Sequence, residues 1–475
     1  MQRLLDLPLL VILMGIGALA MYLPAMHAFA MRDLSVARPF FYGGTVFLIL
    51  TAMVGIATSN YRPRNVARSQ LAALLGAYLF LPLLLAVPFD QAVRDTTYLN
   101  AWWEMVSSFT TTGATLYDAP DRLAPSLHLW RALVGWLGGF FVLLTAAAVL
   151  APLDLGGAEV LTGRVPGRGA VGAMQITRIA DPSERLVRHS LTLFPAYAGL
   201  TLLLWVLLLL SGETGLVAVV HAMSTLSTSG ISPGQGVAFG ASGIVGEMLI
   251  FVFLFLALTR RSLPGAVLVD RTRGIAQDHE LNMALVFLVL VPAVLFLRHW
   301  LGALQINEVQ NLAAAAHALW GALFTTLSFL TTTGFESADW QAAQSWSGLG
   351  APGLILLGLA IIGGGVGTTA GGLKLLRVYA LARHGERELD RLVHPSSIGG
   401  SGEAARHLRR EGAYMAWIFF MLFALSFAII VLALALTGLA FEPALVLTVA
   451  AVTTTGPLTA LASEIPIRIL DLSPT

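Results

Sequence analysis

Long hydrophobic runs alternate with short polar segments along almost the whole of this chain. An α-helix needs about 20 apolar residues to cross the hydrocarbon core of a bilayer, and nine runs come close to that length. The pattern therefore predicts an all-α, multi-pass membrane protein. Its expected spans are 7–28, 39–57, 71–89, 129–151, 191–211, 242–259, 281–298, 350–377 and 414–439.

The first hydrophobic run invites comparison with a secretory signal peptide. Its apolar core extends from about Leu7 to Ala28, which is longer than that of a signal peptide and long enough to span a bilayer. We therefore expect this run to be retained as the first transmembrane helix.

Four shorter apolar runs lie between these spans, and each ends in a turn rich in threonine, serine and glycine. The four turns are Phe109–Gly113, Leu226–Gly230, Leu330–Gly334 and Val452–Gly456. They recur at intervals of roughly 100 to 120 residues, far longer than a solenoid repeat, so each belongs to a subdomain-sized unit. The runs that precede them are Leu99–Phe109, Leu216–Leu226, Ala313–Leu330 and Pro443–Val452.

These shorter runs predict re-entrant helices. A helix of about 11 residues covers roughly half of a hydrocarbon core. The irregular backbone that follows it is tolerated only where it lines a water-filled cavity or is buried in protein. The repeating unit is therefore a span, a re-entrant helix, a turn and a second span. We place the four units at 70–152, 189–260, 280–378 and 412–475, after two extra spans and a basic loop in 1–69.

Composition supports the membrane assignment. Hydrophobic residues make up 56% of the chain and charged residues 12%, with a mean hydropathy of +0.78, whereas soluble domains carry about 25% charged residues. The net charge of +1 gives no indication of nucleic-acid binding. The absence of cysteine from the sequence excludes disulfides and thiolate metal sites.

The positions of the basic residues orient the spans. If the N-terminus is cytoplasmic, the segments 59–69, 152–189, 260–280 and 374–411 face the cytoplasm and carry most of the 28 Lys and Arg residues. Cytoplasmic loops of membrane proteins are enriched in these residues. We therefore expect a cytoplasmic N-terminus and place all four turns on the outer side.

The chemistry of the turns suits a monovalent cation. Each helix dipole directs its negative end at the turn, extended backbone aims carbonyls at the axis, and glycine leaves room for them. Hydroxyls add oxygen ligands or brace the backbone, and an oxygen ring without carboxylates does not suit Ca²⁺ or Mg²⁺. One such turn would be an ordinary helix stop, but four copies favour an ion-binding ring. The expected ion-binding residues are Thr111, Thr112, Gly113, Thr228, Ser229, Gly230, Thr332, Thr333, Gly334, Thr454, Thr455 and Gly456.

A glycine-rich segment interrupts the eighth span between Ile361 and Lys374. Six glycines within ten residues do not sustain a straight helix, because each costs about 1 kcal/mol relative to alanine. A phosphate-binding loop requires two glycines separated by four residues before Lys and Ser or Thr, a pattern that this segment lacks. We therefore expect the segment to line a cavity.

The segments Trp103–Gly113 and Trp130–Gly139 resemble the first pore loop and the following helix of the Trk/Ktr/HKT superfamily of potassium uptake proteins. The two extra spans resemble its TrkH-type branch, and the resemblance covers nearly the whole chain. It implies four fused membrane-pore-membrane repeats around a pseudo-fourfold pore, with K⁺ as the transported ion. It also implies a homodimer in the lipid of the cytoplasmic (inner) membrane, regulated by a cytosolic nucleotide-binding ring of the TrkA type. In this superfamily a glycine in each filter turn goes with potassium selectivity, and all four turns here have one.

An intramembrane loop just below the filter acts as a gate in this superfamily, and the glycine-rich segment resembles it. The resemblance implies gate residues Gly363, Gly364, Gly365, Gly367, Thr368, Thr369, Gly371, Gly372 and Lys374. Lys374 has a second interpretation as a basic anchor whose stem lies along apolar surface while its amine reaches the cytoplasmic side. Both interpretations stay open.

Other polar residues near the turns give weaker indications of function. Asp118, Glu336 and Asp339 follow the turns, where they either raise the local cation concentration or are solvated loop charges. Glu104 starts the first re-entrant helix, where we expect structural support. His221 and His317 are expected to be packed or hydrogen-bonded rather than ligands.

Two other functions remain open. A secondary transporter with broken helices would show two pseudo-symmetric halves, and a non-conducting binding or regulatory homologue would keep only the fold. The second alternative draws on the 19 residues after Gly456, which hold no counterpart of the family's final helix. Either the chain is a truncated form, which we favour, or its C-terminus has diverged and the pore wall is open on one side. Arg468 is therefore not given the role of that helix's arginine. Enzyme activity is not expected, because no metalloprotease or nucleophile-elbow motif is present in the sequence.

Overall fold

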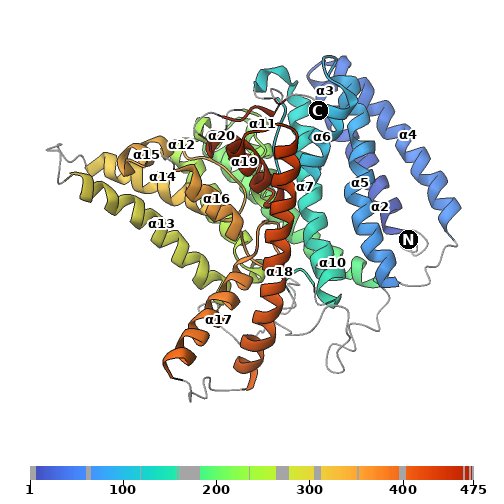
Figure 1. Ribbon diagram of the computed structural model, residues 1–475. Helices are drawn as coiled ribbons and strands as arrows, with labels where there is room; N and C mark the ends of the chain where they lie inside the picture. The colour runs from blue at the N-terminus through green and yellow to red at the C-terminus, as the bar shows by residue number, and fades with distance from the viewer. Residues whose placement is uncertain are drawn as a thin grey trace.

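The computed structural model describes residues 7–59, 66–117, 119–153, 155–157, 160, 182–234, 236–263, 278–303, 312–349, 352–394, 403–463, 466–469 and 472. Every regular element within these segments is a helix (Figure 1). The expected all-α fold is therefore confirmed.

Two extra spans lie at one side of the molecule, on the right in Figure 1. The first consists of α2 (Leu9–Ala20) and α3 (Tyr22–Ala30), and the second is α4 (Leu34–Thr58). The carboxylate of Asp33 accepts hydrogen bonds from the backbone N–H groups of Ser35 and Val36 at 3.1 and 3.3 Å. This side-chain cap satisfies donors that have no partner within α4 and fixes where the helix begins.

The first two units follow the expected order of span, short helix, turn and returning helix. Unit one contains α5 (Val66–Ala92), α6 (Tyr98–Phe109), η1 (Pro120–Arg122) and α7 (Pro125–Thr145), extended by η2 (Ala146–Leu150) and η3 (Ala151–Leu153). Unit two contains α10 (Pro182–Leu210), α11 (Gly215–Ser227), η4 (Val237–Phe239), α12 (Gly243–Leu254), η5 (Phe255–Ala257) and η6 (Arg260–Ser262).

The last two units use the same order with longer connections. Unit three contains α13 (His279–Ala303), α14 (Leu312–Leu330), α15 (Trp340–Ser347) and α16 (Gly353–Ile362), and α17 (Leu375–Val393) follows the glycine-rich segment. Unit four contains α18 (Glu403–Leu436), α19 (Phe441–Val452) and α20 (Leu458–Leu461).

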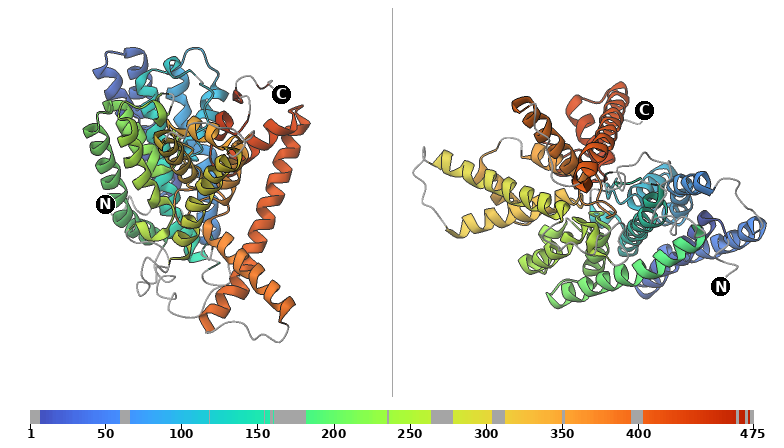
Figure 2. Two further views of the ribbon diagram at one scale, coloured as in Figure 1. Left: turned by 90° about the vertical axis from the view of Figure 1, so that its left-hand side faces the viewer. Right: turned by 90° about the horizontal axis from the view of Figure 1, so that it is seen from below.

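The four units surround a common centre. Seen along the axis in Figure 2 (right), they follow one another in chain order, from cyan through green and yellow to red. The helices that precede the four turns, α6, α11, α14 and α19, each pack against the preceding helix of their own unit. Contacts between units also form, because α11 packs on α7 and α19 on α16. This arrangement brings the C-terminal ends of these four helices together.

Eight helices in the described segments are long and apolar enough to cross a membrane. Seven of them coincide with expected spans, and the eighth, Ala313–Leu330, was expected as a re-entrant helix. The expected spans 242–259 and 350–377 are instead the shorter helices Gly243–Ala257 and Gly353–Ile362. Helix α16 stops early because Gly363 adopts a left-handed φ of 73° and turns the chain out of the helix.

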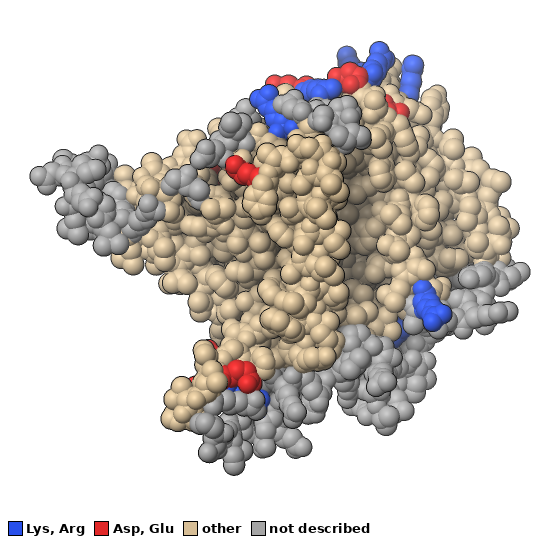
Figure 3. Space-filling model, viewed as in Figure 1, with Lys and Arg blue, Asp and Glu red and all other residues tan. Residues whose placement is uncertain are grey.

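Charged side chains gather at two ends of the molecule. Figure 3 shows a broad band without Lys, Arg, Asp or Glu between charged groups at its top and bottom. We call the end with Arg94 and Arg122 the upper end, and the end with α17 the lower end. Helix α18 also exposes apolar side chains, since Leu425, Ile429 and Leu432 are all more than half exposed. Such a surface suits hydrocarbon, and the chain is a multi-pass membrane protein.

Candidate functional site

The helices α6, α11, α14 and α19 end in the same backbone motif. Two residues after the last helical turn, the N–H groups of Thr112, Ser229, Thr333 and Thr455 donate to carbonyls five residues earlier, at 2.9 to 3.0 Å. The preceding N–H group in each copy donates to the carbonyl three residues earlier. These paired bonds define a Schellman motif, which normally places glycine at its left-handed position.

Threonine occupies that left-handed position in all four copies. The φ angles of Thr111, Thr228, Thr332 and Thr454 are 58°, 52°, 57° and 54°. A positive φ is strained for a β-branched residue, with a cost of about 1–3 kcal/mol each, and such strain concentrates at functional sites. Four strained threonines at equivalent positions therefore distinguish these turns from ordinary helix stops and make them the candidate functional feature of the fold.

Hydroxyl groups brace each turn from within. The side chains of Thr110 and Thr112 approach to 2.8 Å, and the corresponding pairs in the other turns to 3.0, 3.1 and 3.0 Å. The first hydroxyl of each pair also donates to the carbonyl four residues earlier in its helix. These hydroxyls fix the direction of the backbone between them, so the main-chain carbonyls of the turn are held rather than free to rotate.

The turns touch one another in a closed circle, which we call the turn ring (residues 110–113, 227–230, 331–334 and 453–456). A Cβ added to Gly113 would overlap the carbonyl of Ser229, and one added to Gly230 would overlap the carbonyl of Thr333. A Cβ on Gly334 would lie 2.8 Å from the Pro457 ring, and one on Gly456 would overlap Ala114. Each glycine therefore faces the next unit, and only a residue without a side chain permits this approach.

The fourth turn departs from the other three. Gly113, Gly230 and Gly334 have φ angles of 71°, 65° and 81°, whereas Gly456 is not left-handed. Its N–H group instead donates to the Thr112 carbonyl at 2.7 Å, across the junction of units four and one. Pro457 follows, and its ring fills the space beside both Gly230 and Gly334. The ring is therefore fourfold in backbone motif but asymmetric in detail.

The glycine-rich segment, residues 363–374, lies directly against the turn ring, and we call it the glycine loop. The N–H group of Gly371 donates to Oγ1 of Thr332 at 2.7 Å, and a Cβ on Gly371 would overlap the Thr453 carbonyl. Thr369 Oγ1 lies 3.4 Å from the carbonyl of Leu226, near the end of α11. The tertiary structure thus brings together the two segments that the sequence singled out separately.

Positive φ angles shape the glycine loop. Gly363, Gly367 and Gly372 adopt 73°, 67° and 76°, and Lys374 adopts 82° as the residue before α17. The Lys374 ammonium donates to the carbonyl of Ala370 within the loop. Its side chain is therefore folded back on the loop rather than extended toward the lower end.

The opposite side of the glycine loop is held by unit two and by α13. Gly365 N–H donates to the Ala257 carbonyl at 2.9 Å, and Val366 N–H donates to Oε1 of Glu280 at 2.8 Å. Glu280 is fully buried and also pairs with Arg260 at 3.3 Å. Sequence reasoning missed Glu280, because a single carboxylate at the start of an apolar run fits no motif.

Two further buried carboxylates support the upper end. Glu104 pairs with Arg131 at 2.5 Å and accepts the N–H of Leu116 at 3.1 Å. Glu247 accepts hydrogen bonds from Trp320, Ser337 and Ala338 at 2.7 to 2.8 Å. Both groups hold the segment that follows a turn, which agrees with the structural role expected for Glu104.

Four other polar candidates, His221, His317, Glu336 and Asp339, lie within the described residues. His221 is buried and contacts the Ser232 hydroxyl at 2.9 Å, and His317 contacts Asp339 at 2.9 Å. Burial raises the pKa of the Glu336 carboxyl above its usual value. Asp118 lies outside the described residues. Both histidines are therefore engaged with neighbouring side chains.

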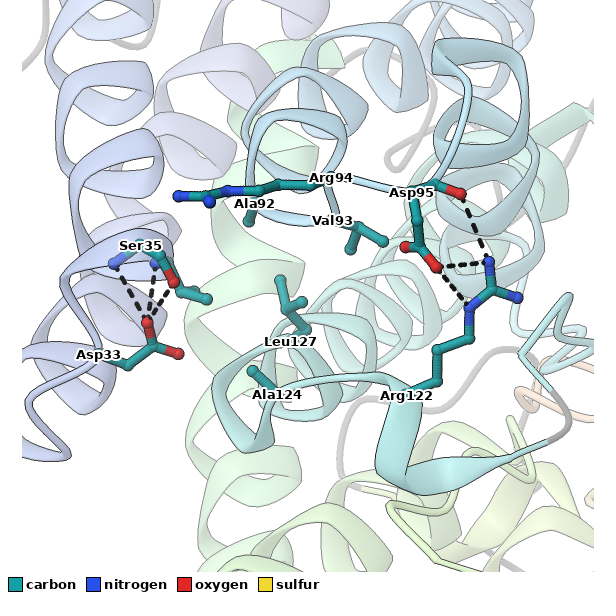
Figure 4. Close-up of a pocket in the computed structure, with 10 residues that line it drawn as sticks. Asp33, Ser35, Ala92, Val93, Arg94, Asp95, Arg122, Ala124 and Leu127 are labelled. Carbon is teal, nitrogen blue, oxygen red and sulfur yellow. Dashed lines mark hydrogen bonds and ion pairs between the residues drawn. The ribbon is translucent and has the colours of Figure 1, made fainter.

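A cavity of about 360 Å³ opens at the upper end, between the α3–α4 turn and unit one (Figure 4). Arg122 pairs with Asp95 across one side of it at 2.9 Å, and Asp33 lies at the opposite side. None of its lining residues belongs to the turn ring or the glycine loop. This cavity is therefore separate from the candidate site.

Comparison with known proteins relates the whole arrangement to membrane transport. The TrkH model of cation transport proteins matches residues 248–465, which include the third and fourth turns and the glycine loop. The chain is 27% identical to the Trk system potassium uptake protein TrkH of Vibrio parahaemolyticus, over 90% of this chain and 85% of that protein. It is 29% identical to TrkH of Salmonella typhimurium, over 78% of this chain and 73% of that protein.

The fold has a counterpart among solved structures. The crystal structure of the potassium transporter TrkH from Vibrio parahaemolyticus matches with a TM-score of 0.74 at 25% sequence identity, covering 99% of this chain and 93% of that chain. These relatives are transport proteins, which confirms the expectation that the chain is not an enzyme.

Proposed function

Because this chain belongs to the TrkH family of cation transport proteins, we propose that it takes up potassium ions through the turn ring. The observation that carries this proposal is the fourfold repetition of one strained backbone motif around a closed circle. Carbonyls held in such a circle replace the hydration shell of an ion that enters it. The relatives named as potassium uptake proteins support K⁺ as the ion.

The twelve expected ion-binding residues have two roles in this proposal. Carbonyl oxygens of the turns contact the ion, and the hydroxyls of Thr112, Ser229, Thr333 and Thr455 keep those carbonyls aligned through their paired contacts. The glycines let neighbouring units approach closely enough to close the ring. Selectivity then follows from a ring of fixed size and fixed dipoles.

The glycine loop is the proposed gate. It contacts Thr332 directly and approaches the ends of α11 and α19, so it lies on the path of an ion that leaves the ring toward the lower end. Three glycines with positive φ give this segment backbone conformations that few other residues adopt without strain. Displacement of the loop opens the path, and Lys374 stabilises the closed form by bonding to Ala370.

The surroundings of the pore follow from the same proposal. The protein lies in the cytoplasmic (inner) membrane with its N-terminus and the lower end in the cytoplasm, as the distribution of Lys and Arg in the sequence predicts. The exposed apolar side chains of α18 contact lipid or a second copy in a homodimer. A cytosolic nucleotide-binding ring of the TrkA type would reach the gate from the lower end.

Complementation tests this function. Cells that lack their own potassium uptake systems, supplied with this chain and a TrkA-type partner, are expected to grow at low K⁺. Gly113→Ser should reduce that growth and lower the K⁺/Na⁺ flux ratio of the purified protein in liposomes. Growth that is indifferent to Gly113→Ser would remove the filter assignment, and absence of flux in every form would favour a non-conducting homologue.

A secondary transporter is the alternative with a distinct structural expectation. It requires two pseudo-symmetric halves that rock about a central site, whereas the backbone motif here repeats four times around one axis. Flux that saturates and depends strictly on a coupled ion gradient would support it over a channel-like path.

A further inference from the structure

Glu280 is the one buried carboxylate that touches the glycine loop among the described residues. It lies in the first turn of α13, and its side chain is fully buried. Oε1 accepts the N–H of Val366 at 2.8 Å. A backbone N–H group buried without a partner is costly, so the carboxylate satisfies a donor that the irregular loop cannot satisfy by itself.

The second oxygen of Glu280 is held by unit two. Oε2 lies 3.3 Å from the Arg260 guanidinium and accepts the Arg260 N–H at 3.5 Å. The Glu280 N–H group in turn donates to Asp278, whose other oxygen accepts the Thr259 hydroxyl at 2.5 Å. These bonds hold the Glu280 side chain in one orientation, with Oε1 directed at the glycine loop.

The glycine loop is held on two opposite sides. On the ring side Gly371 N–H bonds to Thr332 Oγ1, and on the far side Val366 N–H bonds to Glu280. A second far-side bond, Gly365 N–H to the Ala257 carbonyl, joins two backbones. Glu280 is thus the side chain that ties the loop to the α12–α13 junction.

From this geometry we propose that Glu280 is a positioning residue of the gate: it latches the glycine loop in its closed position through the Val366 N–H, and Arg260 holds the latch in place. The inference rests on the proposed function, because it assigns a role within the gate. Release of the latch frees the loop to move away from the ring, and the closed state loses population relative to the open state.

A matched pair of variants isolates the hydrogen bond from the charge. Glu280→Gln and Glu280→Leu both remove the negative charge that faces Arg260, but only glutamine keeps an oxygen to accept the Val366 N–H. Both variants leave the Arg260 guanidinium without its carboxylate partner. Any difference between the two variants is therefore due to the oxygen that accepts the Val366 N–H. The same pair in an Arg260→Leu background serves if the single variants do not fold.

Glu213→Leu is the control for loss of a buried carboxylate elsewhere. Glu213 is 7% exposed and accepts hydrogen bonds from Thr214, Ala241 and Ser242 at 2.8 to 3.3 Å. These residues connect the starts of α11 and α12 and do not contact the glycine loop in any bond described above. Glu213→Leu should therefore leave the resting K⁺ flux and the deuterium exchange of the glycine loop at their wild-type values.

Two measurements on the full-length protein in liposomes test the latch: K⁺ flux without a regulatory partner, and deuterium exchange of the peptides that contain residues 363–374. Glu280→Leu is expected to raise the resting flux on the order of tenfold and to speed loop exchange, because a buried donor loses its acceptor. Glu280→Gln should remain close to the wild type in both.

The outcomes separate the latch from the proposed function. Wild-type flux and exchange in Glu280→Leu would overturn the latch, and so would equal increases in the leucine and glutamine variants. Faster loop exchange in Glu280→Leu alone, with no K⁺ flux in any form, would uphold the latch and overturn potassium conduction. Raised flux with faster loop exchange only in the leucine variant would support both.

Discussion

The N–H group of Gly371 donates to the side-chain oxygen of Thr332 at 2.7 Å, and this bond joins the glycine loop to the turn ring. Thr332 is one of the four threonines with a left-handed backbone, and its side chain is fully buried. The strained backbone of the ring thus presents a hydroxyl to the loop below it. The ring and the glycine loop are joined through the Thr332 side chain, so a displacement of one is transmitted to the other.

Replacing Thr332 by valine should loosen this junction. Valine keeps the β-branch and the volume, so the left-handed strain is retained while the acceptor for Gly371 N–H is lost. We expect a higher resting K⁺ flux in liposomes, with a cost to the closed state of about 1–3 kcal/mol. Thr332→Ser keeps the hydroxyl and should remain near the wild type. Equal fluxes in the two variants would contradict a role for the hydroxyl.

A side chain at Gly113 should damage the ring more than a side chain at a glycine of the lipid-facing helices. Gly113 has a φ of 71°, and an added Cβ would overlap the Ser229 carbonyl. Gly113→Ala should therefore lower K⁺ flux and the K⁺/Na⁺ ratio together. Gly199→Ala in α10 is the control, because nothing lies within 4 Å of a Cβ there. A normal ion ratio in Gly113→Ala would count against close approach as the basis of selectivity.

Breaking the buried pair of Glu104 and Arg131 should destabilise the fold. Both side chains are at most 4% exposed, and removal of one partner leaves an uncompensated charge at a cost of about 3–5 kcal/mol. Arg131→Met should lower the thermal unfolding midpoint of the detergent-solubilised protein. Glu104→Gln/Arg131→Met should recover much of the loss, since glutamine still accepts the Leu116 N–H. Failure of the double variant to recover would show that the pair acts through something other than charge.

Glu336 should give K⁺ flux a dependence on outer pH. Burial raises its pKa, so the carboxyl becomes protonated at a higher pH than an ordinary glutamate. If its charge attracts cations to the mouth of the ring, flux at low K⁺ should fall as the outer pH drops through this raised pKa. Glu336→Gln should have lower flux at neutral pH and should lack this decrease. Asp339→Asn, whose carboxylate contacts His317, serves as the comparison.

An unchanged pH profile in Glu336→Gln would show that the Glu336 carboxylate does not attract cations to the ring.

The sequence by itself determined the membrane fold and the location of both candidate segments, the four turns and the glycine loop. Hydrophobic length identified seven of the eight helices in the described segments that are long enough to span, and the four turns are visible because irregular backbone at membrane depth interrupts an apolar sequence with glycine and small hydroxyl residues. The interruption at Gly363 was equally visible, since glycine in an apolar run breaks a helix whatever surrounds it.

Only the tertiary structure decided how these segments meet. The left-handed threonines did not follow from propensity, because glycine is the usual residue at that position and packing overrides the preference. The asymmetry at Gly456 and the role of Glu280 depend on contacts between residues far apart in the chain, Gly456 with Thr112 and Glu280 with Val366. Such contacts are set by how the helices close around the axis. A single carboxylate in an apolar sequence does not indicate which backbone N–H group it will bind.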